Sequence, residues 1–306
     1  MEKNDFGGVL CFNKPAGCTS HDIVYRVRKL YGTKQVGHTG TLDPLATGVL
    51  VVMVGRAVKA SEFLTADEKE YVATLKLGLT TDTEDITGEV LSEYKGEMPD
   101  FETVKSAVFS FTGEIEQVPP MYSALKKDGK KLIDLARQGI TVEREARKVR
   151  VDKIDVFETE KPDEFLLNVR VSKGTYIRTL CADIGKKLGC GGTMKTLMRL
   201  EASGFTLEDA VTLEQLEAMS ESDREKRLLP TEVVFRSKRS CTLSSFFGKL
   251  GRAGAEIYLR KIGFSAEVGE RVALFDDRGF FALGEVKEYP DGFAIKPIKQ
   301  FDTPVE

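Results

Sequence analysis

A glycine- and threonine-rich segment near the N-terminus concentrates residues that can do chemistry. Residues 37–48 hold three glycines, three threonines, Asp43-Pro44 and His38, one of the two histidines in the chain. Glycines let a backbone turn tightly and approach a ligand closely, and threonine hydroxyls donate hydrogen bonds. We therefore interpret Asp43 as a carboxylate that a loop presents to a ligand. An Asp that caps a short turn, with Pro44 in the first helical position, is a second and compatible interpretation.

The other residue types narrow the chemistry that Asp43 can take part in. His21 and His38 are the only histidines, which argues against a His-rich metal site or a repeated His–carboxylate relay. The five cysteines include no Cys-x-x-Cys pair, which argues against a zinc ribbon or a disulfide framework. Gly32 and Gly37 have the spacing of a phosphate loop, but His38 follows where that loop needs lysine. We expect the chemistry to depend on carboxylate, Tyr, Lys or Arg side chains.

A carboxylate enclosed in a pocket needs a cation to stay charged. Burial raises the pKa of an Asp above about 3.9, whereas an adjacent guanidinium lowers it. Arg178 is the candidate partner, because it follows a strand pattern at the start of a helix pattern, where the helix N-terminus adds positive potential. Arg178 is also compatible with a solvated residue of the first helical turn, and the sequence by itself does not bring it to Asp43.

Six motifs together resemble the TruB family of tRNA pseudouridine-55 synthases. They occur in the order of the family and span roughly residues 7–205. The motifs are Lys14-Pro15-x-Gly17-x-x-Ser20, Gly37–Leu50, Lys69-Glu70-Tyr71, Leu77-Gly78 with Thr81-Asp82-Thr83-x-Asp85-x-x-Gly88, Pro119–Lys126 and Ser172–Arg178. The resemblance implies isomerisation of one T-loop uridine of tRNA, at position 55, to pseudouridine without metal or cofactor.

The resemblance also implies a fold and roles for the site residues. We expect an α+β catalytic domain, residues 1–235, with a mixed, largely antiparallel sheet and flanking helices. A small, β-rich, PUA-like RNA-binding domain is expected at residues 236–306. Asp43 would attack the nucleoside, Tyr71 would stack on the flipped base, and Arg178 would pair with Asp43. Because Tyr71 lies on a strand with alternating apolar residues, it can also be interpreted as an aromatic residue of the hydrophobic core.

Further substrate contacts follow from the same resemblance. Tyr176 and Leu197 are expected to line the pocket, and His38 to fill the space in the T-loop that the extruded base leaves. Lys14 and Lys126 are expected to bind the RNA.

Hydrophobic spacing predicts the elements that must hold these side chains. Ser20 is the expected cap of the first helix, and Thr212 with Gln215 predicts a capping box. The predicted helices run from Ser20 to Gly32, from Asp100 to Gly113 and from Ile177 to Gly189, and the predicted strands include Val49–Val54, Tyr71–Leu77, Phe165–Val171 and two short runs around the turn Asp276–Gly279.

Charge is distributed unevenly along a chain whose net charge is -3. Residues 121–150 hold nine Lys or Arg against four acids, whereas residues 208–225 hold seven acids and one arginine. The basic stretch is expected to bind phosphates of the tRNA T-arm, although two ordinary solvated faces would show the same charges. A noncatalytic RNA-binding or RNA-chaperone protein is therefore the alternative function.

The remaining features predict a cytoplasmic protein, and we expect a monomer without an obligate protein partner. The longest apolar run, Val49–Val54, is far shorter than the roughly 18 residues of a membrane span. Residues Met1–Phe6 contain no apolar signal core.

Overall fold

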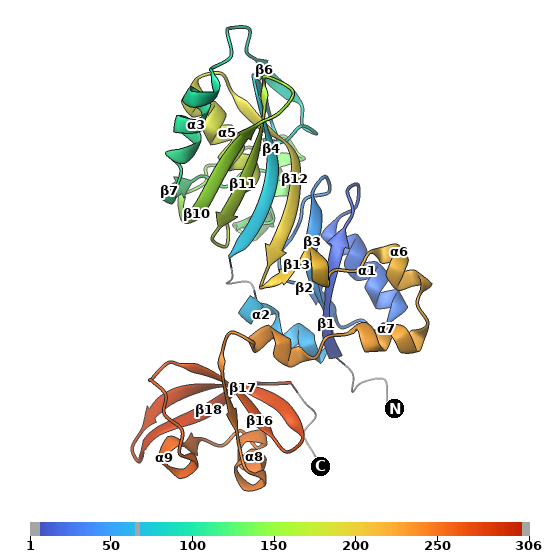
Figure 1. Cartoon of the computed structure of the whole chain (residues 1–306), viewed down its shortest axis with the longest axis vertical. Coiled ribbons are helices and arrows are strands. Elements are labelled where there is room, and N and C mark those ends of the chain that lie inside the picture. Colours follow the sequence, from blue (N-terminus) through green and yellow to red (C-terminus); the bar gives the residue numbers. More distant parts are fainter. Residues whose placement is uncertain (1–6, 65–67, 302–306) are drawn as a thin grey trace.

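The computed structural model describes residues 7–64 and 68–301, in two parts along the long axis of the molecule (Figure 1). The larger part is a sheet with helices, and the smaller part is a separate β-rich domain. The expectation drawn from Met1–Phe6 lies outside the described residues. Among the residues described, no helix is long and apolar enough to cross a membrane.

The larger part is built on a nine-stranded sheet with the path β1-β3-β12-β4-β11-β10-β7. β2 and β13 pair with β3 and β12 beside this path. The β3–β12 pairing is parallel and the other pairings are antiparallel, so the predicted mixed, largely antiparallel sheet is confirmed. The strands are β1 (Gly7–Lys14), β2 (Val36–His38), β3 (Thr47–Gly55), β4 (Lys69–Leu77), β7 (Gly113–Gln117), β10 (Arg147–Glu158), β11 (Glu164–Val171), β12 (Gly192–Ala202) and β13 (Phe205–Thr206).

Hydrophobic patterning explains how the central strands are covered. β3 is apolar on both faces because Leu50 and Val52 face one hydrophobic cluster while Val49 and Val51 face another. β4 alternates instead, with Tyr71, Ala73, Leu75 and Leu77 buried and the residues between them partly exposed. The uninterrupted run and the alternating run therefore mark a strand covered on both faces and a strand covered on one.

Three helices pack against this sheet. α3 (Phe101–Phe109) and α5 (Ile177–Leu188) lie side by side behind β10, β4 and β12, and α1 (Ser20–Leu30) lies beside β1 and β3 (Figure 1). The predicted cap of α1 is wrong by one residue, because Thr19 forms a capping box with Asp22 and Ser20 is the first helical residue. α3 ends at Phe109 because the chain turns into β7, whose first residue Gly113 has φ 99°.

The basic and acidic stretches form separate small elements. The basic stretch folds into the hairpin of β8 (Lys126–Lys127) and β9 (Lys130–Lys131), then α4 (Leu132–Ala136). The acidic stretch forms α6 (Leu213–Ala218) and α7 (Glu221–Arg227), and the predicted Thr212–Gln215 capping box is confirmed. A further hairpin, β5 (Leu79–Thr81) and β6 (Val90–Glu93), lies at the far end of the molecule (Figure 1).

The C-terminal domain has a five-stranded sheet in the order β14-β16-β17-β18-β15, which agrees with the predicted PUA-like β-rich domain. The β14–β16 pairing is parallel and the others are antiparallel. Its elements are β14 (Arg239–Thr242), α8 (Ser245–Arg252), β15 (Ile257–Tyr258), α9 (Leu259–Ile262), β16 (Arg271–Asp276), β17 (Gly279–Tyr289) and β18 (Gly292–Gln300).

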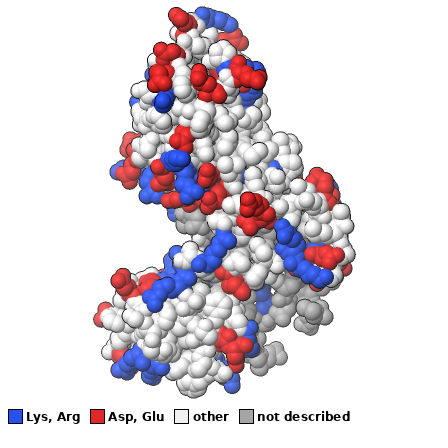
Figure 2. Space-filling model, in the orientation of Figure 1, with Lys and Arg blue, Asp and Glu red and all other residues white. Residues whose placement is uncertain are grey.

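An aromatic cluster joins the two parts. The ring of Phe235 lies 5.6 Å from that of Phe63 in the larger part, and 5.5 and 5.3 Å from those of Phe280 and Phe301 in the smaller part. On one side of this junction the surface is hollowed, and basic side chains lie along the hollow (Figure 2). The boundary at 235/236 stays a prediction, and the first strand of the second sheet begins at Arg239.

Candidate active site

A cavity of about 500 Å³ lies beside the large sheet. Its walls come from the loop between β2 and β3, from β4 and β12, from the start of α5, and from the basic stretch. These elements bring together five residues that the sequence singled out far apart in the chain. They are Asp43, Tyr71, Tyr176, Arg178 and Leu197.

Asp43 and Arg178 form an ion pair in the cavity. Arg178 Nε lies 2.9 Å from Asp43 Oδ2, and Arg178 Nη2 donates to Asp43 Oδ1 at 3.3 Å. The Arg178 side chain is 5% exposed and that of Asp43 is 33% exposed. The guanidinium is therefore enclosed while the carboxylate keeps an open face, and Arg178 is not the solvated residue that its position alone would allow.

Other groups fix the guanidinium of Arg178 in place. Its Nη1 donates to the carbonyl of Thr83 at 2.9 Å, and its Nη2 donates to the carbonyl of Tyr122 at 2.9 Å. The Asp85 carboxylate lies 3.8 Å from Nη1 on the far side and accepts hydrogen bonds from Thr83 and Thr87. Arg178 thus stands between two acids, and its hydrogen bonds to the backbone fix its orientation toward Asp43.

The site also sets the proton affinity of Asp43. Burial raises the pKa of the Asp43 carboxyl above its ordinary value, the Arg178 guanidinium opposes that rise, and the charge of Asp85 adds to it. The Arg178 guanidinium lowers the pKa of Asp43 as expected, but the opposite effect of burial is larger. A carboxylate with a raised pKa and an open face is suited to attack or to proton transfer near neutral pH.

Hydrogen bonds from side chains of α1 and β1 hold the loop that carries Asp43. Ser20 Oγ accepts from Leu42 N–H at 2.8 Å and donates to Leu42 O at 3.1 Å. Lys14 Nζ donates to the carbonyls of Pro15 and Cys18, both at 2.8 Å, and more weakly to that of Pro44 at 3.4 Å. The backbone on both sides of Asp43 is therefore tied down, which keeps its carboxylate in one position.

Arg199 of β12 holds the loop from the other side. Its side chain is buried, its Nη2 donates to Gly40 O at 3.2 Å, and its Nε donates to Val49 O at 2.7 Å. A Cβ added at Gly48, where φ is 100°, would come within 2.2 Å of the Arg199 carbonyl oxygen. The last glycine of the segment is therefore required because β3 and β12 approach closely there.

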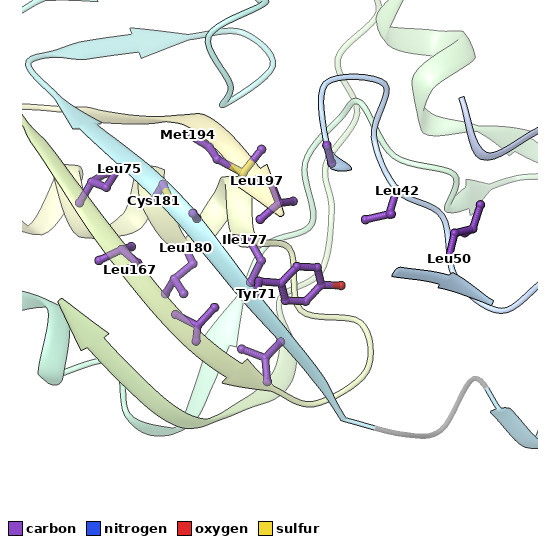
Figure 3. Close-up of a cluster of buried hydrophobic side chains, with 14 of the residues drawn as sticks. Leu42, Leu50, Tyr71, Leu75, Leu167, Ile177, Leu180, Cys181, Met194 and Leu197 are labelled. Carbon is purple, nitrogen blue, oxygen red and sulfur yellow. The ribbon is translucent and has the colours of Figure 1, made fainter. Parts of the chain in front are cut away.

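Tyr71 is both a core residue and a wall of the cavity. It is 7% exposed, pairs across the strands with Arg199, and lies with its ring centroid 6.0 Å from the Arg199 guanidinium. Figure 3 shows its ring pointing out of the cluster toward the loop that carries Leu42, with Leu197 nearby on β12. The two interpretations of Tyr71 are thus compatible, since one side of the residue packs and the other lines the cavity.

Three expected RNA contacts lie elsewhere. Lys14 differs most from expectation, because its side chain is fully buried beneath the loop and presents no surface to a ligand. His38 precedes the loop and lies outside the cavity lining; its Nδ1 accepts from Gly40 N–H at 3.3 Å, and burial lowers its pKa. Lys126 is exposed on the β8–β9 hairpin, where it lines a separate pocket. Lys131 and Arg137 of the same basic stretch line the cavity that holds Asp43.

Ser20 and Arg199 are functional supports that sequence reasoning missed. Ser20 belongs to one of the motifs but is interpreted as a helix cap, and Arg199 lies outside all six motifs. A signal for Arg199 was its place two residues after Leu197, on the same face of the strand. Among the described residues, no group of three or more His, Cys, Asp and Glu side chains is placed to hold a metal ion.

Comparison with known proteins shows the family to which the chain belongs. A family model described as TruB family pseudouridylate synthase, N-terminal domain, matches residues 28–177. A second, described as tRNA pseudouridylate synthase B C-terminal domain, matches residues 178–236. The tRNA pseudouridine synthase B of Alkaliphilus oremlandii is 44% identical over 92% of this chain and 93% of its own length. That of Clostridium perfringens is 42% identical over 95% of this chain and 98% of its own.

Solved structures extend the likeness to the whole fold. A chain in the crystal structure of a Cbf5–Nop10–Gar1 complex has a TM-score of 0.73 and 27% identity, covering 96% of this chain and 84% of that one. A chain of the archaeal box H/ACA Nop10–Cbf5 complex has a TM-score of 0.70 and 25% identity, covering 96% and 86%. With its two family domains in sequence and relatives matched along nearly their full length, the chain belongs to the TruB family of pseudouridylate synthases.

Proposed function

We propose that this enzyme converts a uridine of tRNA, at position 55 in the T-loop, to pseudouridine, with Asp43 as the nucleophile. The observation that carries the proposal is the Asp43 carboxylate, open to a cavity on one side and paired with the enclosed Arg178 on the other. The relatives named tRNA pseudouridine synthase B support tRNA as the substrate.

The reaction needs a charged nucleophile and little else. The bond between N1 of uracil and C1′ of ribose breaks, a bond forms between C5 and C1′, the proton on C5 leaves, and N1 takes up a proton. Asp43 attacks either the sugar or the ring, and both routes require the ionised carboxylate. Arg178 keeps that charged form available against the effect of burial, since the guanidinium favours it. Tyr71 is the group beside the cavity for moving the C5 proton.

The walls of the cavity suit a uracil base that has left its stack. Taking a base out of an irregular loop costs a few kcal/mol. Stacking of the base on Tyr71 would return about 1–3 kcal/mol, and Leu197 and Tyr176 would enclose its other edges. These side chains leave the base free to rotate, which the change from N1 to C5 attachment requires.

Basic side chains around the cavity suit the phosphates of a T-arm. Lys131 and Arg137 line it, and Lys126 is exposed on the adjacent hairpin. Contacts of this kind fix the register of an RNA without reading its bases. The C-terminal domain would add contacts farther along the tRNA.

Incubation of the purified protein with an unmodified tRNA transcript, with no cofactor or metal added, tests the proposal. Pseudouridine is then mapped at single-nucleotide resolution. We expect one new pseudouridine, at the T-loop uridine. Pseudouridine at other positions would contradict the proposed site, and tRNA binding without any pseudouridine would favour the alternative, a noncatalytic RNA-binding or RNA-chaperone protein.

A further inference from the structure

The start of α5 carries Arg178 but has no cap of its own. Its N-cap residue, Tyr176, makes no side-chain capping hydrogen bond. The first turn of a helix leaves backbone N–H groups without intrahelical partners, and an uncapped first turn frays easily. The ion pair with Asp43 nevertheless depends on where this turn lies, because Arg178 is its second residue. Another part of the fold must therefore fix it.

Gln117, the last residue of β7, does so. Its side-chain amide makes two hydrogen bonds to the backbone of Tyr176: the Tyr176 N–H donates to Oε1 at 2.8 Å, and Nε2 donates to the Tyr176 carbonyl at 3.0 Å. Gln117 is 2% exposed and is held in the ladder with β10 opposite Arg147. Two bonds from one planar amide fix both the position and the rotation of the Tyr176 backbone.

The same segment touches the guanidinium itself. Five residues after Gln117, the carbonyl of Tyr122 accepts from Arg178 Nη2 at 2.9 Å. The chain from Gln117 to Tyr122 therefore contacts the α5 start at its backbone and at its functional side chain. It continues into the basic hairpin that begins at Lys126.

From these contacts we infer that Gln117 is a positioning residue for the Arg178–Asp43 pair, an inference that rests on the proposed function. Gln117 is not part of the cavity lining. Its amide sets the first turn of α5, and that turn sets the distance and angle at which Arg178 meets Asp43. Displacements of about 1 Å at a reacting group cost on the order of 100-fold in rate.

The alternative is that Gln117 contributes only to stability, and the chain offers a matched control for it. Gln300 lies in the C-terminal domain, where its Nε2 donates to the carbonyls of Gly251 and Arg252 at the end of α8, at 3.3 and 2.8 Å. It is likewise a glutamine amide with two bonds that pin a helix end, but it lies in the domain that lacks the cavity.

Three variants separate the two roles. Gln117→Met and Gln300→Met keep the side-chain volume and remove the amide, and Gln117→Glu keeps the acceptor for Tyr176 N–H while it removes the donor. We measure kcat and KM for pseudouridine formation, the Kd for tRNA, the pH–rate profile and the Tm. For Gln117→Met we expect kcat to fall about 10- to 100-fold with KM and Kd within about twofold of wild type. Its acid limb should move to higher pH because a misplaced Arg178 stabilises the Asp43 carboxylate less. The fall in kcat should be smaller for Gln117→Glu than for Gln117→Met.

Gln300→Met should lower the Tm as much as Gln117→Met and leave kcat unchanged. The inference is overturned if Gln117→Met keeps kcat and the acid limb of wild type, if its loss lies in KM alone, or if Gln300→Met loses as much kcat. Should Gln117→Met not fold, Gln117→Glu is judged by the same criteria. A wild-type protein that forms no pseudouridine contradicts the proposed function, whereas active wild type with unaffected variants contradicts the inference alone.

Discussion

The cavity beside α5 and the C-terminal domain each contain an Arg–Asp pair, and the two carboxylates face different surroundings. In the C-terminal domain, Arg252 donates to both oxygens of Asp276 at 2.7 Å, and the backbone N–H of Arg278 donates to it as well. Asp276 is 2% exposed, whereas Asp43 is 33% exposed. A Cβ at Gly248 would come within 2.8 Å of Asp276, so this carboxylate is closed in by backbone.

The pKa directions of the two carboxyls are opposite. Hydrogen bonds from Arg252 hold the pKa of Asp276 below its ordinary value, whereas burial raises that of Asp43 despite Arg178. An Arg–Asp pair in which both carboxylate oxygens are held by hydrogen bonds stabilises the fold. A pair whose carboxylate is open and less strongly held leaves that carboxylate available to react. We therefore assign stability to the Arg252–Asp276 pair and catalysis to the Arg178–Asp43 pair.

Arg178→Lys should produce the largest change in rate. A single ammonium cannot contact both Asp43 oxygens and the carbonyls of Thr83 and Tyr122 that the guanidinium reaches now. We expect single-turnover pseudouridine formation to fall about 10²–10⁴-fold. Arg252→Lys is the control, since it should lower the Tm and leave the rate near wild type. Equal effects of the two variants on the rate would break the comparison.

Asp276→Asn should produce the largest change in stability. It removes the negative charge of the buried pair with Arg252, whose side chain is 11% exposed, which costs about 3–5 kcal/mol. Denaturant unfolding measures this free energy. Asp43→Asn should cost less, because the raised pKa shows that burial already disfavours the charge there. A larger loss of stability in Asp43→Asn would contradict our assignment.

The two pairs should also separate along pH. In the proposed mechanism activity requires the ionised Asp43, so the rate should fall as the pH drops through a pKa raised above about 3.9. The contribution of Asp276 is present above its unfolded-state pKa and is lost only as the pH falls through the lower, folded-state pKa. A pH–rate profile and unfolding curves at each pH should show activity lost before the stability that Asp276 contributes. Loss of both at the same pH would be evidence against this separation.

The smallest expected effect belongs to the hairpin. Lys126→Ala should reduce the slope of log K against log salt for tRNA binding by about 0.7–0.9 and leave the rate at saturating tRNA unchanged. Lys105→Ala, on α3 beside Glu102, is the control and should leave the slope as it is. Binding that does not depend on salt would exclude phosphate contacts by this hairpin.

The sequence predicted the elements and the residues that line the cavity better than the side chains that hold them in place. Alternating apolar residues at Tyr71–Leu77 and the unbroken apolar run at Val49–Val54 locate β4 and β3. The spacing of apolar residues indicates whether a strand is buried on one face or on both. Motif resemblance selected Asp43 and Arg178. Their meeting across 135 residues of sequence depends on sheet order, which local pattern does not contain.

The supports were out of reach because their partners are backbone atoms distant in sequence. Ser20 bonds to Leu42, Gln117 to Tyr176, and Arg199 to Gly40. A side chain that binds a backbone group leaves no complementary residue type to recognise. The cap of α1 shows the local limit, since Thr19 and Ser20 both offer a hydroxyl and only Asp22, three residues after Thr19, decides between them.

Asp43→Asn tests the central claim most directly. The substitution keeps the shape of the side chain and removes the nucleophile, while the surfaces that we assign to RNA binding stay in place. The measurement is pseudouridine at the T-loop uridine of an unmodified transcript, alongside the Kd for that tRNA. We predict binding within about threefold of wild type and a loss of at least roughly 10⁴-fold in rate. Pseudouridine formed by this variant within about tenfold of the wild-type rate would contradict the account.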